Sequence, residues 1–305
     1  MKIVSLLPSA TEIVYALELG DELVGVTDEC DFPAEATTKP VVSRTALPQD
    51  RPLSPGRVDA AVRERMAAKQ PLYVLDRELL AREQPDVILT QDLCRVCAVP
   101  TGQVQRALDE LGLPDAQVVS LDPQSLGEAI GQLEIVGTLL DREERAKELA
   151  EGLRERVETI KRRALRLPTV RMFALEWSDP PMVGGHWIPE LIELAGATNL
   201  LNEKGQRSKE VTWREIADAM PEIVVFMPCG YYLEEAEEEA PRLLSNPDFA
   251  DTNAAREGAI YATDATSYFS RPGPRLVDGL EILAWAGHPD DFPEPPPGRI
   301  SRAGR

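Results

Sequence analysis

The stretch that decides the fold is KIVSLLPSATEIVYALELGDELVGVT, residues 2–27. It begins with the short apolar run Lys2–Leu7, which is typical of a buried strand. Ser9 and Glu12 follow with the spacing of a capping box, which predicts a helix that ends near Gly20. The run ELVGVT then predicts a second strand. A strand, a helix and a strand with short links indicate a parallel sheet covered by helices.

The alternation continues through DVILT and QVVSLDP, after a polar insertion at Gln49–Tyr73, and restarts with VRMFALEW after a long charged helical pattern. We therefore predict an α/β protein with two parallel-sheet lobes, joined by a single long helix, and a ligand cleft between the lobes. The expected parts are an N-terminal lobe at 1–124, a helical linker at 125–167, a C-terminal lobe at 168–290 and a disordered Pro-rich tail at 291–305.

The net charge of −19 makes nucleic acid and anionic membrane surfaces poor partners. No segment is apolar enough to span a bilayer, so we expect no membrane insertion. The start MKIVSLLPSATE has no long apolar core and no small-residue cleavage site, which predicts a cytoplasmic protein. A periplasmic or extracellular location is the alternative if a signal was removed.

The unusual residues of this chain gather in loops that follow predicted strands. Ligands bind at the carboxyl ends of such strands, and aromatic side chains in the loops of a chain with only 5% aromatics favour a stacking wall for a flat ligand over an apolar plug. The candidate ligand-binding residues on these loops are Phe32, Trp177, His186, Trp187, Tyr231, Tyr268, Phe269 and Arg271.

All four cysteines also lie in these loops, at Cys30, Cys94, Cys97 and Cys229. Cys94 and Cys97 form a C-x-x-C pair, which is half of a structural zinc site or a redox pair. One interpretation is that the four thiolates, with or without His186, hold zinc, another soft metal or an iron–sulfur cluster. The alternative is that they are small buried apolar side chains.

Catalytic motifs are missing from the sequence: there is no G-x-S-x-G, no P-loop and no H-E-x-x-H. With two histidines, the chain has little material for a Ser/His/Asp arrangement. We predict a binding protein and not an enzyme; a metal- or thiol-dependent enzyme on the same scaffold is the alternative.

Several segments, including residues 2–33, RELLAREQPDVILT, VGGHWIPELIELAGATNLL, TWREIADAMPEIVVF and YFSRPGPRLVDGLEILA, resemble the periplasmic vitamin B12-binding family. The same segments are similar to the iron-siderophore and haem binders of this class of ABC transporter. The resemblance covers about residues 2 to 290, without the insertion.

The resemblance implies a cobalamin-like corrinoid or another metal chelate as the ligand and an ABC permease as the partner. It adds Asp31 to the candidate ligand-binding residues. Family members dock on their permease through one surface Glu in each lobe. Glu78 matches the first of these positions, and the second is expected near Thr198, where this chain has no Glu.

Overall fold

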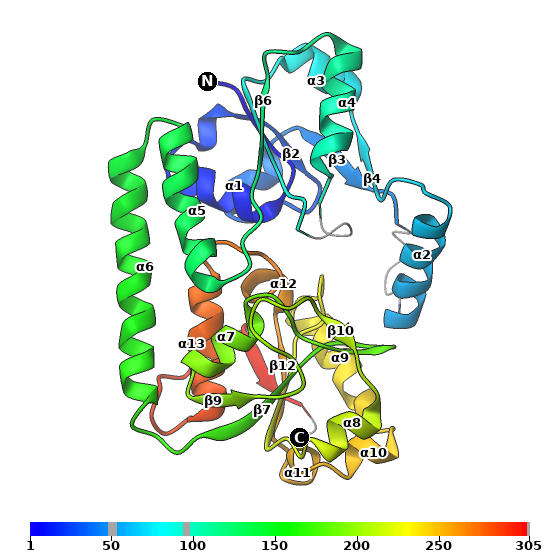
Figure 1. Ribbon diagram of the computed structural model, residues 1–305, viewed down its shortest axis with the longest axis vertical. Coiled ribbons are helices and arrows are strands. Elements are labelled where there is room, and N and C mark those ends of the chain that lie inside the picture. The colour runs from blue at the N-terminus through cyan, green and yellow to red at the C-terminus, as the bar shows by residue number, and fades with distance from the viewer. Residues whose placement is uncertain (48–53, 94–97, 304–305) are drawn as a thin grey trace. The chain divides into compact units, whose positions relative to one another are not determined.

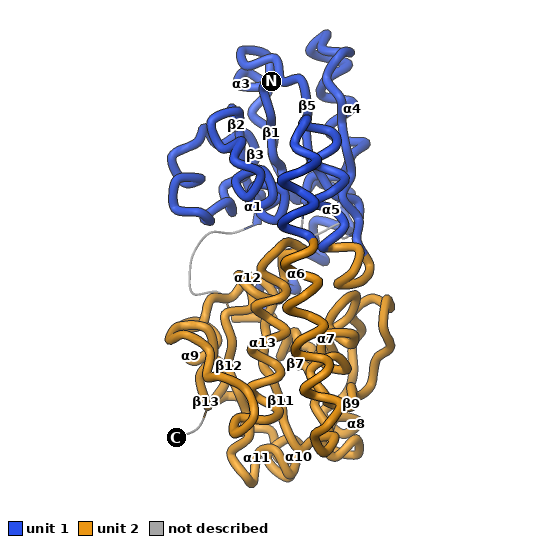
Figure 2. The backbone as a smooth tube through the Cα atoms, turned by 90° about the vertical axis from the view of Figure 1, so that its left-hand side faces the viewer, with its two compact units in different colours: residues 1–51, 57–123, 130–150 blue, residues 52–56, 124–129, 151–305 orange. Residues whose placement is uncertain are grey.

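The computed structural model describes residues 1–47, 54–93 and 98–303. They divide into two compact units, shown in different colours in Figure 2. Unit 1 comprises Met1–Arg51, Arg57–Pro123 and Ile130–Ala150, and unit 2 comprises Pro52–Gly56, Gln124–Ala129 and Glu151–Arg305. Each unit has a sheet and an apolar core of its own, so the predicted two-lobe α/β architecture is confirmed.

Unit 1 is built on a sheet with the strand order β4-β3-β2-β1-β5-β6. Figure 1 labels β2, β3, β4 and β6 of this sheet. Neighbouring strands are parallel, except that β4 is antiparallel to β3. The strands are β1 (Ile3–Ser5), β2 (Leu23–Thr27), β3 (Val41–Thr45), β4 (Tyr73–Leu75), β5 (Val87–Thr90) and β6 (Gln117–Ser120). The helices are α1 (Pro8–Ala16), α2 (Pro55–Ala67), α3 (Arg77–Glu83) and α4 (Thr101–Leu111), with short 3-10 turns at Gly20–Glu22 and Ala34–Thr38.

Unit 2 is built on a sheet with the order β10-β8-β7-β11-β12-β13, and β9 pairs with the start of β7. The central strands β7, β11 and β12 are parallel, whereas β8, β10 and β13 pair in antiparallel fashion. The strands are β7 (Val170–Ser178), β8 (Pro181–Val183), β9 (Ala197–Asn199), β10 (Lys209–Glu210), β11 (Ile223–Phe226), β12 (Ile260–Thr263) and β13 (Ile300–Arg302). The helices are α7 (Ile188–Leu194), α8 (Trp213–Asp218), α9 (Leu233–Leu243), α10 (Pro247–Ala250), α11 (Asn253–Arg256), α12 (Ala265–Tyr268) and α13 (Leu276–Gly287).

The period of two along the strands explains how the central sheet of unit 2 is covered on both faces. Phe173, Val224 and Ile260, one on each central strand, belong to the same buried cluster as side chains of α8, α9, α10 and α11. The intervening residues face the other side, where the ring of Tyr261 meets that of Trp285 on α13 edge to face. Strands that are buried on both faces read as continuous apolar runs, as seen in IVVF.

The predicted long joining helix is present but shorter than residues 125–167. This stretch forms two helices, α5 (Leu126–Leu139) and α6 (Glu143–Ala164), and α6 passes from unit 1 to unit 2 between Ala150 and Glu151. The chain reverses at Asp141, whose φ of 56° is incompatible with a continuing right-handed helix. Gly137 lets the two helices approach, because a Cβ there would clash with the side chain of Ala146.

The prediction of a disordered tail at 291–305 is wrong for the part of it that the structure describes. Residues Ile300–Arg302 pair with β12 as an antiparallel edge strand, and Phe292 is buried. Arg302 reinforces this edge by donating to the backbone carbonyls of Gly258 and Glu257. Backbone and guanidinium hydrogen bonds hold this short polar edge strand, so its sequence has no apolar alternation from which the strand could be predicted.

The predicted capping box at Ser9 and Glu12 does not form. Helix α1 begins at Pro8, no side chain caps it, and the Ser9 hydroxyl is buried with no hydrogen-bond partner in the described structure. Pro at the first helical position needs no partner for its missing N–H, which explains the start without a cap.

Candidate ligand-binding site

Three of the predicted loops follow adjacent strands of unit 2. Trp177 lies near the end of β7, Cys229 and Tyr231 follow β11, and Tyr268 to Arg271 follow β12. Because these three strands are parallel neighbours, their carboxyl ends lie at one edge of the sheet. The structure thus confirms that segments about 50 and 90 residues apart in sequence reach a common edge.

Trp177 and Tyr231 form an aromatic pair at this edge. Their ring centroids are 5.7 Å apart and their planes meet at 76°, the edge-to-face arrangement that aromatic rings prefer. The Trp177 indole N–H donates to the carbonyl of Asp179 at 3.1 Å, and the carbonyl of Tyr231 accepts from the N–H of Thr266 at 3.0 Å. Both side chains are half-buried and each ring packs on the other, so they can offer ring surface to a ligand without reorganising.

A carboxylate clamp formed by Glu176 lies beside this pair on β7. Glu176 accepts hydrogen bonds from the hydroxyl of Ser208 at 2.7 and 2.8 Å and from the N–H of Gly185 at 3.2 Å. Burial raises the pKa of Glu176 above its usual value, and the hydrogen bonds from Ser208 and Gly185 oppose this rise. The clamp holds two loops of unit 2 together.

His186 occupies the first of those loops in a left-handed conformation with φ 53°. Its N–H donates to the carbonyl of Gln206 at 2.6 Å, and its carbonyl accepts from the N–H of Gly205 at 2.9 Å. Its Nδ1 is buried and has no hydrogen-bond partner in the described part of the chain. Burial, and then the nearby charge of Arg207, lower the pKa of the imidazole, so the neutral form is favoured.

The predicted ligand-binding residues Trp187, Phe269 and Arg271 are buried in unit 2. The Trp187 indole N–H donates to the carbonyl of Phe269 at 2.8 Å, and the Phe269 ring packs against Gly279 on α13. The contacts of Trp187 and Phe269 fix the chain where it leaves α12.

Tyr268 lies between two arginines at the same exit. The guanidinium carbons of Arg299 and Arg275 lie 4.9 and 5.7 Å from the centroid of its ring. Burial raises the pKa of the Tyr268 hydroxyl. Asp264 caps α12 by accepting from the N–H of Ser267 at 2.9 Å, and burial raises its pKa as well. Sequence reasoning missed Arg275, Arg299 and Ser208, because none of them follows a strand directly.

In unit 1, the loop after β2 carries Cys30, Asp31 and Phe32. The Cys30 thiol is 4% exposed and its sulfur lies 3.0 Å from the hydroxyl oxygen of Thr11, so it packs as a small buried side chain. Asp31 is half-buried, and Phe32 is 46% exposed.

The described residues include two of the four predicted metal-binding cysteines. Cys94 and Cys97 lie outside the described residues, Cys30 belongs to unit 1, and Cys229 is exposed in unit 2. Among residues 1–47, 54–93 and 98–303, no three His, Cys, Asp or Glu side chains gather closely enough to hold a metal ion. The thiolate hypothesis therefore stays a prediction.

Glu78, the predicted docking residue, is exposed in the first turn of α3. Thr198 lies in β9. None of the helices in the described ranges is both long and apolar enough to cross a membrane.

Comparisons with known proteins agree on the fold. The model of the periplasmic binding protein family matches residues 3–266. A substrate-binding lipoprotein of an ABC transporter from Bacillus subtilis is 25% identical over 96% of this chain and 82% of its own length. The vitamin B12-binding protein of Vibrio cholerae is 23% identical, over 92% of this chain and 86% of its own.

Solved structures show the same fold. A periplasmic haem-binding protein from Pseudomonas aeruginosa superposes with a TM-score of 0.74 at 22% identity, covering 100% of this chain and 98% of its own. The vitamin B12-binding protein of Vibrio cholerae gives 0.67 at 20% identity, covering 93% and 95%. At such identities the likeness concerns the fold and not the ligand.

Proposed function

Because the chain belongs to the periplasmic binding protein family, we propose that it is the substrate-binding component of an ABC transporter and carries a metal chelate of the corrinoid, haem or ferric siderophore kind. Relatives and fold neighbours named for vitamin B12, haem and ferric hydroxamate support this ligand class. Delivery to a permease requires a location outside the cytoplasm, which replaces the cytoplasmic location expected from the sequence alone.

The observation that carries the proposal is the pair Trp177 and Tyr231. Two half-buried rings stand at the carboxyl edge of the unit 2 sheet, in a chain with few aromatic residues. Such rings provide rigid apolar surface for the face or rim of a macrocycle at little entropic cost. Tyr268 with Arg275 and Arg299 adds cationic groups after the neighbouring strand, suited to carboxylates on the periphery of a chelate.

The test is a titration of the purified protein with hydroxocobalamin, haemin and a ferric hydroxamate, followed by tryptophan fluorescence and visible spectra. We expect one of the three to quench fluorescence with a dissociation constant in or below the micromolar range, about −8 kcal/mol of binding free energy. Trp177→Ala should weaken that binding about tenfold or more, since base or macrocycle stacking on an aromatic ring contributes roughly 1–3 kcal/mol.

The matched control is Trp285→Phe, which alters a second Trp–Tyr edge-to-face pair of unit 2, formed with Tyr261 on β12. This variant should keep the wild-type affinity. If none of the three chelates binds at tens of micromolar, the chelate proposal is wrong; if one binds and Trp177→Ala binds it equally, the aromatic pair is not the site.

A further inference from the structure

The two units repeat one structural motif, which the sequence shows as two segments of equal length. DRELLAREQPDVILT (76–90) lies in unit 1, and TWREIADAMPEIVVF (212–226) lies in unit 2. Each segment forms a short helix and then a central strand of its sheet: α3 leads to β5, and α8 leads to β11.

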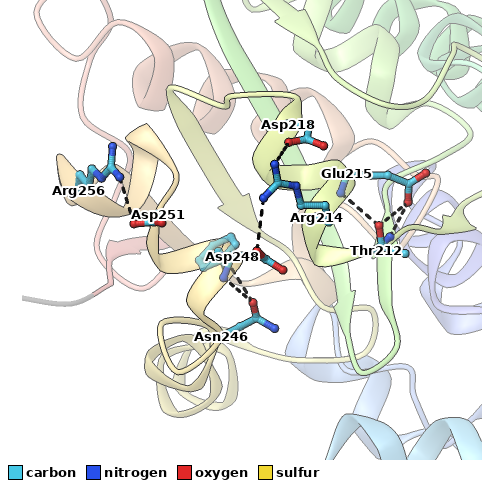
Figure 3. A network of polar contacts seen from close by, with 9 residues as sticks. Thr212, Arg214, Glu215, Asp218, Asn246, Asp248, Asp251 and Arg256 are labelled. Carbon is cyan, nitrogen blue, oxygen red and sulfur yellow. Dashed lines mark hydrogen bonds and ion pairs between the residues drawn. The ribbon is translucent and has the colours of Figure 1, made fainter.

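The two segments match in their capping contacts. Asp76 accepts a hydrogen bond from the N–H of Leu79 at 2.8 Å, and Thr212 accepts one from the N–H of Glu215 at 3.1 Å. Both are N-caps that bond to the third helical residue. The contact in unit 2 is drawn in Figure 3.

The same match holds at the other end of each helix. Gln84 and Met220 both adopt a left-handed conformation, with φ 48° and 47°, and each is followed by a proline. Asp86 then accepts from the N–H of Lys2 at 2.7 Å, and Glu222 accepts from the N–H of Arg171 at 2.8 Å. Lys2 and Arg171 precede or begin the neighbouring strands β1 and β7. The register of the repeat is thus fixed residue by residue.

In this register Glu78 corresponds to Arg214, because each stands two residues after its N-cap. The place in unit 2 that is equivalent to Glu78 is therefore Arg214, whereas Thr198 lies in β9 and outside the repeat. Glu78 is exposed, and the Arg214 side chain is 71% exposed. The two units present opposite charges at equivalent places.

The guanidinium nitrogens of Arg214 lie 3.0 Å from a carboxylate oxygen of Asp218 and 3.9 Å from one of Asp248 (Figure 3). Exposed ion pairs of this kind contribute little to stability and exchange partners readily. The guanidinium can therefore exchange Asp218 and Asp248 for a carboxylate of a docking partner.

We propose that this chain docks on a permease with two non-identical halves, one offering a basic group to Glu78 and the other an acidic group to Arg214. This inference rests on the proposed transport role. A permease made of two identical subunits presents the same group twice, by symmetry. One of its two copies would then meet a like charge on this protein, which weakens association. Opposite charges instead select one orientation of docking on an asymmetric permease.

The test uses the full chain and the binding-protein-dependent permeases of its source organism, each purified separately into nanodiscs. Association is measured at low and high salt for wild type, Glu78→Ala, Arg214→Ala and Arg214→Glu. We expect each Ala variant to bind the cognate permease about tenfold more weakly at low salt, and Arg214→Glu to bind more weakly still, with smaller differences at high salt. The cognate permease should have two different membrane subunits or two fused, divergent halves.

Matched controls are Arg82→Ala in the last turn of α3 and Arg256→Ala in α11, both exposed arginines paired with a neighbouring carboxylate. They should bind as wild type does, and all variants should keep the wild-type chelate affinity. If Arg214→Glu binds as well as wild type or more tightly, Asp218 and Asp248 serve a basic partner and the inference is overturned, while the transport role stands. If wild type binds none of the permeases, the transport role fails and this inference fails with it.

Discussion

Both carboxylate oxygens of Glu176 accept from the hydroxyl of Ser208, at 2.7 and 2.8 Å, although the two residues are 32 positions apart in sequence. The same carboxylate accepts from the N–H of Gly185. It therefore connects β7 to the loop that follows β8 and to the loop that precedes β10. It also keeps Gly184 and Gly185, which precede His186, in place. The clamp makes stability depend on pH.

The pKa of Glu176 is raised in the folded state by burial, above its usual 4.5. Between the unfolded and the folded pKa, the native protein binds more protons than the unfolded chain, so stability falls as pH rises through that window. The Glu176→Gln variant does not lose stability in this way, because the amide has no proton to release in this pH range. We expect the unfolding free energy of the Gln variant, relative to wild type, to increase as pH rises from 4 to 8, measured by urea unfolding at each pH.

Glu215→Gln is the control of opposite sign. Hydrogen bonds from the backbone N–H and hydroxyl of Thr212 lower the pKa of Glu215. Its contribution to stability is present above the unfolded pKa and is lost as pH falls through the folded pKa. The Gln variant should therefore lose more stability at pH 7 than at pH 3. If both variants responded to pH in the same direction, at least one of the two pKa assignments would be wrong.

Gly185→Ala should disrupt the two loops that the clamp joins. A Cβ at this position would lie less than 3.0 Å from backbone atoms of Gln206, Arg207 and Ser208, which cannot move without breaking the hydrogen bonds of His186. We expect a loss of about 1–3 kcal/mol in unfolding free energy, as for other overpacked sites.

Gly152→Ala is the contrasting change, made on the exposed face of α6, where a Cβ meets nothing within 4 Å. It should raise stability by about 0.5–1 kcal/mol through helix propensity. Denaturant unfolding measures both. If Gly185→Ala were as stable as wild type, the close packing of the two loops would be wrong.

Trp187→Phe should destabilise unit 2 without removing a ligand contact. The change deletes the N–H that donates to the carbonyl of Phe269 and leaves a gap in a buried site. Together these cost about 2–3 kcal/mol. The folded variant should still bind the chelate with an affinity close to that of wild type. A large loss of affinity with unchanged stability would instead identify Trp187 as a direct ligand contact.

The sequence reveals those parts of the fold that rest on local periodicity. The runs DVILT and IVVF are strands as predicted, and Pro189 lies in the first turn of α7, because apolar period and backbone restriction act within a few residues. The short strands β8, β10 and β13 escape prediction. They have two or three residues each, and their hydrogen bonds depend on partners far along the chain.

In the candidate site, too, the features that follow from local sequence could be predicted, and those that depend on distant partners could not. Loop position after a strand correctly brings Trp177, Tyr231 and Tyr268 to one edge of a sheet, because parallel topology determines where strands end. It does not determine where a side chain points, so the buried Trp187 and Phe269 look the same in sequence as Trp177. The Glu176–Ser208 contact depends on the pairing of β8 with β10, which no local pattern reports.

The thiolate alternative can be tested through Cys229, which is exposed, whereas Cys30 is buried. Native protein should react with a bulky disulfide reagent at Cys229 in seconds to minutes and at Cys30 only on unfolding, since access controls thiol exchange. Cys229→Ser should remove the Cys229 signal from the fast phase and leave the metal content of purified protein, by elemental analysis, unchanged. If Cys229→Ser and Cys94→Ser instead each abolish bound zinc or iron, thiolates from distant segments form a real metal centre, and the chelate-carrier role must give way to it.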